Sequence, residues 1–167
     1  MRFILASIAF LCCIQSSISQ DTLNIPHLSD NASNSEIKVV LDSIEQRITD
    51  LNVHNNFAEI IKYSEKGFSL AERIDDVQSI LKISRYYGTA LMRMNDTIRA
   101  GKVLNASYEK AKILQDTTAI VYAVADLGNY YNMLLQDHEK AIEFYNKGIE
   151  LHTGCLLYTS PSPRDRG

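Results

Sequence analysis

An all-α protein built from about three helical hairpins is the fold that the sequence predicts, on three observations. Apolar residues recur at steps of three or four along most of the chain. Similar residues return about every 40 positions. Only seven glycines and three prolines interrupt the 167 residues, of which 46% are hydrophobic and 22% are charged. This composition is typical of a single soluble helical domain.

Six segments carry an apolar stripe with the helical period, so that their hydrophobic side chains share one face. In chain order they cover residues 37–51, 57–74, 80–94, 98–114, 120–134 and 141–151. Short polar stretches rich in Asn and Asp separate them, and these residue types favour the first position of a helix. The predicted N-caps include Ser35, Asp76, Asp116 and Asp137.

The six segments pair into three repeat units of about 40 residues. Gly88 and Gly128 are 40 positions apart, as are Asp76 and Asp116. A row of small residues, Gly67, Ser107 and Gly148, has nearly the same spacing. The predicted units are residues 36–75, 76–115 and 116–154. Glycine costs roughly 1 kcal/mol in a helix, so we expect the matched glycines to lie where two helices approach closely.

The last unit resembles the tetratricopeptide repeat. It has Leu127-Gly128 followed by Tyr131, and then Ala141, Tyr145 and Gly148 at matching places in the second helix. The resemblance implies a right-handed α-solenoid that binds protein partners. A period of 40 exceeds the usual 34 and is also near that of HEAT and armadillo repeats. The positions assigned to the repeat pattern are Gly67, Gly88, Leu91, Ala100, Ser107, Leu127, Gly128, Tyr131, Ala141, Tyr145 and Gly148.

Both ends of the chain are expected to lie outside the repeats. Residues 1–19 have a basic start, an apolar run and small residues before a cleavage point, which predicts a signal peptide and export to the periplasm or the exterior. Residues 20–35 are polar and are predicted to be a flexible lead-in. Residues 155–167 are predicted to be non-native, because Cys155–Asp165 is similar to the translation of a transposon sequencing adapter. The sixth helix should then stop at Gly154, and the natural protein should continue further.

Several function classes receive no support from the sequence. The net charge is -3 and the basic residues are scattered, which argues against nucleic-acid binding. The three cysteines lie in the leader and the tail, and the four histidines have no second ligand at metal spacing. No nucleophile, partnered base or phosphate loop is found. We therefore expect no catalytic residues, no metal, no cofactor and no membrane insertion of the mature chain.

The candidate binding site is the face of each first helix that lines the concave groove in this family. The first unit offers Asp42, Glu45, Thr49 and Asn52 there. The other two units offer Lys82, Arg85, Thr89, Met92, Arg93, Tyr122, Ala125, Asn129, Asn132 and Met133. The cations could hold an acidic peptide or a C-terminal carboxylate. The alternative interpretation is a solvated polar face that binds nothing.

Two functions are compatible with these features. The first is a scaffold without enzymatic activity that binds a peptide or partner protein in the groove. The second is the extracytoplasmic sensor region of a longer bacterial signalling protein, with a histidine-kinase or helix-turn-helix output beyond the repeats. The uninterrupted gene beyond Thr153 would separate them, since a sensor needs an apolar run of about 20 residues there.

Overall fold

The computed structural model describes residue 25 and residues 28–159, with side chains up to residue 153. Six α-helices make up this part of the chain, which contains no strand, and the predicted all-α class is confirmed. They are α2 (Asn34–Val53), α3 (Phe57–Arg73), α4 (Val77–Arg93), α5 (Thr97–Ile113), α6 (Thr117–Met133) and α7 (His138–Thr159). No helix in the described residues is both long enough and apolar enough to span a bilayer.

The helices begin at side chains that accept a hydrogen bond from the first turn. Asp76 and Asp116 are N-caps as predicted, and Asp137 accepts from the amide of Lys140 at 3.0 Å. The prediction for the first helix is wrong, because α2 is capped by Ser33 and not by Ser35. Glu36 lies three residues after Ser33 and accepts from its backbone amide at 2.8 Å, which completes a capping box.

All five connections between helices are short, with three residues in each of the first four and four residues in the last. One residue in each adopts a left-handed conformation, with φ between 53° and 59°, and the next residue precedes the following helix. These residues are Asn55, Asp75, Asn95, Gln115 and Gln136. Asn and Asp tolerate this conformation better than most residues. The turns within the first two units therefore resemble the turns between units, whereas the turn of the third unit is one residue longer.

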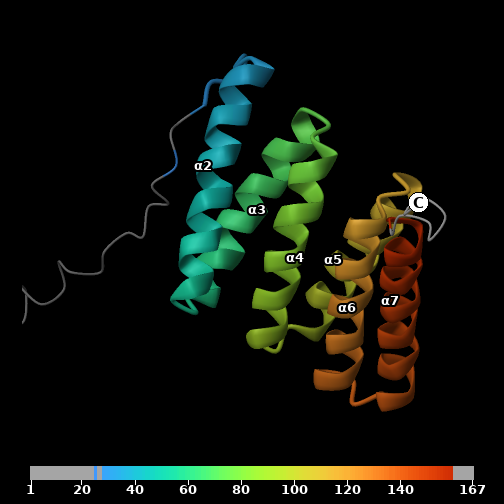
Figure 1. Cartoon of the computed structure of the whole chain (residues 1–167). Coiled ribbons are helices and arrows are strands. Elements are labelled where there is room, and N and C mark those ends of the chain that lie inside the picture. The colour runs from blue at the N-terminus through green and yellow to red at the C-terminus, as the bar shows by residue number, and fades with distance from the viewer. Residues whose placement is uncertain (1–24, 26–27, 160–167) are drawn as a thin grey trace, which may run out of the picture.

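The helices stack in chain order, as Figure 1 shows from α2 on one side to α7 on the other. Each helix packs against its neighbours in sequence, and α4 also contacts both α2 and α6. Within the described chain, α3, α5 and α7 meet only through side chains, as in the ion pair of Arg99 with Glu65 and the ring contact of Tyr108 with Phe144. The first helices of the three hairpins, α2, α4 and α6, thus form a continuous row. The contact of α2 with α4 is called the first seam below, and that of α4 with α6 the second seam.

The core consists of two clusters of buried side chains. One includes Ile37, Leu41 and Ile48 and fills the space between α2, α3 and α4. The other includes Leu91, Leu104 and Leu127 and extends from α4 to α6. Leu91 and Leu127, assigned to the repeat pattern, are completely buried. The apolar stripes predicted for the helices are therefore used in packing both within units and between units.

The repeat glycines lie at close helix crossings, as expected. A Cβ atom on Gly88 would overlap the side chain of Leu104, and one on Gly128 would overlap the ring of Tyr145. At Gly67 a Cβ atom would meet Ile44 of α2 and Ile83 of α4, each at 2.9 Å. Small residues are thus required where the helix axes approach.

Two predictions about the ends need correction. The lead-in is not wholly free, because Leu28 and Ala32 pack against the first cluster and Arg73 donates to the carbonyl of Asp30 at 2.5 Å. Helix α7 does not stop at Gly154 but continues to Thr159. Glycine weakens a helix without ending it, whereas Pro161 disfavours helical geometry in the residue before it. The predicted signal peptide and residues 160–167 lie outside the described residues.

Candidate functional site

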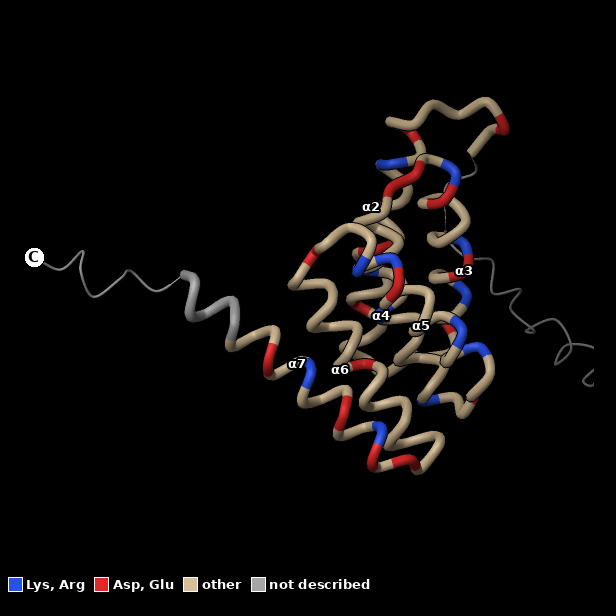
Figure 2. The backbone as a smooth tube through the Cα atoms, turned by 90° about the vertical axis from the view of Figure 1, so that its right-hand side faces the viewer, with Lys and Arg blue, Asp and Glu red and all other residues tan. Residues whose placement is uncertain are grey.

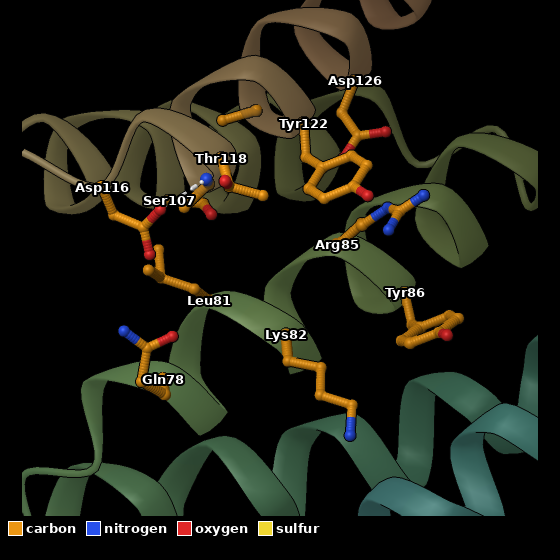
Figure 3. Close-up of a pocket in the computed structure, with 12 residues that line it drawn as sticks. Gln78, Leu81, Lys82, Arg85, Tyr86, Ser107, Asp116, Thr118, Tyr122 and Asp126 are labelled. Atoms are coloured by element: carbon orange, nitrogen blue, oxygen red, sulfur yellow. Dashed lines mark hydrogen bonds between the residues drawn. The ribbon is translucent and has the colours of Figure 1, made fainter. Parts of the chain in front are cut away.

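A cavity of about 280 Å³ opens at the second seam, between α4 and α6. Its walls come mainly from the exposed edges of these two first helices, with Ser107 of α5 at its base. Figure 3 shows the side chains that surround it. They are Gln78, Leu81, Lys82, Arg85, Tyr86, Ser107, Asp116, Thr118, Ala119, Tyr122, Ala123 and Asp126.

One end of the cavity combines a cation, an aromatic ring and a carboxylate. The guanidinium carbon of Arg85 lies 4.2 Å from the ring centroid of Tyr122, a cation-π contact. Asp126 follows one turn later on α6 (Figure 3) and is half-buried. Burial raises the pKa of Asp126 to about 6, although the positive charge of Arg85 acts in the opposite direction. Neither charged group has an ion-pair partner within 4.0 Å among the described residues.

The other end of the cavity is formed by the N-terminus of α6 and the first turn of α4. One carboxylate oxygen of Asp116 accepts the backbone amide of Ala119 at 2.9 Å. The second oxygen of Asp116 has no hydrogen-bond partner within the described part of the chain. Gln78 lies across the cavity from it, as Figure 3 shows. This end therefore offers an acceptor that the protein itself leaves unused.

The first seam is closed by ion pairs instead. Lys38 of α2 donates to Asp76 at 2.6 Å and to the Ser79 hydroxyl at 3.1 Å. Lys82 of α4 pairs with Glu45 of α2 at 2.7 Å. Burial alone would raise the pKa of Asp76, but hydrogen bonds from Lys38 and Ser79 outweigh it and hold this pKa below its usual value. The charged groups of the first seam thus pair with one another, although the Oε1 atom of Glu45 is buried without a hydrogen-bond partner among the described residues.

The structure brings three of the predicted site residues together, since Lys82, Arg85 and Tyr122 all line the cavity. Met92 was predicted to face the groove, and this is wrong. It is 6% exposed and belongs to the second core cluster. The apolar stripe of α4 is wide enough to include Met92 next to Leu91, so its side chain turns inward.

The remaining predicted residues lie away from the cavity. Thr89 and Arg93 follow on the next turns of α4 and do not line it. On α6, Asn129 accepts a hydrogen bond from the Tyr145 hydroxyl at 2.9 Å, and Asn132 bonds to His138 at 2.8 Å. These two amides therefore serve the contact with α7. Met133, 47% exposed, ends α6.

Sequence reasoning missed Asp126 and Gln78. Asp126 lies four residues after Tyr122, and Gln78 lies four before Lys82, so each shares a helix face with a residue that was predicted. Asp126 is also the only charged residue of α6, whereas α7 carries charges along its length (Figure 2). Extending the stripe by one turn in each direction would have found both residues.

Within the described residues no cluster of three or more His, Cys, Asp or Glu side chains could hold a metal ion. Comparisons with protein-family models, with curated proteins and with solved structures found no match to this chain. The geometry of the second seam is therefore the basis for a functional proposal.

Proposed function

We propose that this protein is an interaction scaffold of the tetratricopeptide-repeat type, a right-handed α-solenoid that binds a peptide or a peptide segment of a partner protein at the second seam. The stacking of hairpins in chain order supports it, and so does the continuous row of α2, α4 and α6, which gives an extended surface. The binding step involves no bond making or breaking by the scaffold.

One observation carries the proposal. At the second seam Arg85 and Asp126 border a cavity without forming an ion pair, although the equivalent seam next to it is closed by two ion pairs. Arg85 is exposed, but the carboxylate of Asp126 is partly removed from water without a partner, which costs free energy. Groups of this kind concentrate at functional sites. A bound ligand would supply the missing partners.

The charges of the cavity change the expected ligand. Lys82 is already paired with Glu45, and the carboxylates of Asp116 and Asp126 also line the cavity. A strongly acidic peptide, the ligand favoured by the sequence alone, would meet like charges there. A peptide with both an anionic and a cationic group suits the site better.

The test is a selection from a random peptide library with the full chain, followed by titration of the selected peptides. The Arg85→Ala/Tyr122→Ala double variant should weaken binding at least tenfold, because it removes the cation and the exposed ring at the mouth of the cavity. Lys102→Ala, an exposed cation on α5 away from the cavity, is the matched control and should bind as wild type does. Selection of no peptide, or equal binding to the double variant, would rule out the proposal.

A further inference from the structure

The two seams can be compared position by position with the 40-residue repeat. Asp76 of the first seam corresponds to Asp116 of the second, and both are N-caps. The ammonium of Lys38, which binds Asp76, corresponds to the neutral amide of Gln78. The hydroxyl of Ser79, the other donor to Asp76, corresponds to the methyl group of Ala119. The second seam thus keeps the acceptor and loses both donors.

The other ion pair is replaced in a complementary way. Glu45 of the first seam corresponds to Arg85 of the second, and Lys82 corresponds to Tyr122. A carboxylate that pairs with a lysine is therefore replaced by a guanidinium that stacks on a ring. The N–H groups of Arg85 have no hydrogen-bond acceptor among the described residues. At this end the protein provides a donor, and the nearby carboxylate of Asp126 forms no ion pair with it within 4.0 Å.

We infer that the second seam is completed by a short peptide with free ends, whose ammonium group binds Asp116 and whose carboxylate binds Arg85. The inference rests on the proposed function and names the class of ligand for the same cavity. The ammonium takes the place that Lys38 fills in the first seam. The carboxylate supplies the charged partner that Arg85 lacks at the position corresponding to Glu45.

The size of the cavity sets the length of this peptide. Gln78 and Arg85 are seven residues apart on α4, which corresponds to about 10 Å along a helix. An extended chain covers about 3.3 to 3.6 Å per residue, so three residues span that distance. The volume of about 280 Å³ is at the small end of ligand pockets, which start at about 300 Å³. Small side chains therefore fit best.

Isothermal titration of the full chain with trialanine tests both ends separately. N-acetyl-trialanine lacks the ammonium charge, and trialanine amide lacks the carboxylate. Each blocked peptide should bind at least about tenfold more weakly than the free one, because each loses a charged hydrogen bond. Asp116→Asn keeps a good N-cap. It should lower the affinity for free trialanine by a similar factor and leave the affinity for the acetylated peptide unchanged. Arg85→Gln should likewise weaken the binding of free trialanine while leaving the binding of trialanine amide, which lacks the carboxylate, unaffected.

Two further variants separate recognition from folding. Asp76→Asn makes the same change at the first seam and should leave trialanine binding unchanged. Gln78→Lys copies Lys38 into the second seam, so its own ammonium should occupy Asp116. This variant should have a higher melting temperature than wild type, and its affinity for trialanine should be lower by a factor of at least about ten. A loss of binding combined with higher stability cannot result from misfolding.

The outcomes also distinguish the two proposals. If trialanine fails to bind, or binds as well with blocked ends, the inference is wrong. The proposed function then still stands if library peptides bind and lose affinity in the Arg85→Ala/Tyr122→Ala variant. If neither trialanine nor any library peptide binds, both are wrong.

Discussion

At the scale of single residues, the pKa values of Asp126 and Asp76 show the difference between the two seams. Its carboxylate is half-buried and has no close partner, and burial raises its pKa to about 6. Asp76 is also partly buried, but the hydrogen bonds from Lys38 and Ser79 hold its pKa below the usual value. The pKa values of these two aspartates are thus shifted in opposite directions, because Asp76 accepts hydrogen bonds that favour its charged form and Asp126 does not.

The raised pKa of Asp126 makes stability depend on pH. The folded state binds more protons than the unfolded state between about pH 4 and 6, so the free energy of unfolding falls as the pH rises through this range. Asp126→Asn cannot ionise and should therefore be more stable than wild type at pH 7, by roughly 1 to 3 kcal/mol, but not at pH 4. Urea denaturation of both proteins at each pH measures the difference. A constant difference across the range would contradict the assigned pKa.

At the scale of the elements, each hairpin depends on a glycine where its two helices cross. Gly88 of α4 approaches Leu104 of α5, and Gly128 of α6 approaches the ring of Tyr145 of α7. Gly148 of α7 is less restricted. Among the described residues, a Cβ atom there would meet only Val124 Cγ2, at 3.2 Å. The glycines at the two repeat positions of the third unit therefore have different packing roles.

Alanine substitutions at two of these glycines test the difference. Both gain helix propensity, but only Gly128→Ala forces the ring of Tyr145 to move and threatens its hydrogen bond to Asn129. We expect Gly128→Ala to be less stable than Gly148→Ala by about 1 to 3 kcal/mol. Thermal and urea denaturation give the two values. Equal stability of the two variants would mean that α6 and α7 do not cross at Gly128.

The whole molecule is asymmetric along its stack. Helix α4 packs against α2, α3, α5 and α6, whereas within the described residues α7 packs against α6 and meets α5 only through the side chain of Tyr108. An apolar hollow runs along α6 and α7, lined in part by Val121 and Phe144, and Ile149 beside it is 62% exposed. At the corresponding place in the first unit, Gly67 is covered by Ile83 of the following hairpin. The third unit therefore lacks a contact that the first unit has.

This asymmetry predicts unequal local stability. Segments with few buried contacts open more often than the central ones. Amide hydrogen exchange should be slowest in α4 and fastest in α7, with α2 and α3 closer to α4. Exchange followed by mass spectrometry of peptic fragments measures this order. Protection of α7 equal to that of α4 would show that its exposed face is covered in solution.

Much of the fold could be predicted from particular residues. The apolar stripes gave the helical segments, and Asp76, Asp116 and Asp137 gave three of their starts because capping depends on neighbours in sequence. Ser33 was not predicted, although Ser33 and Glu36 have the spacing of a capping box and Ser35 has no such partner three residues later. Lys82, Arg85 and Tyr122 were found because they share exposed faces of their helices. Met92 was misplaced because the width of a buried stripe depends on how many helices surround it.

The sequence by itself determined the helices, their caps and the 40-residue repeat, because these depend on local hydrogen bonds and on the periodicity of apolar residues. Only the tertiary structure decided which charges neutralise one another. Lys38 and Asp76 are 38 residues apart and meet only because α2 packs beside α4. The open cavity at the second seam follows from the same packing, since it exists where the replacements of that pair do not bind each other.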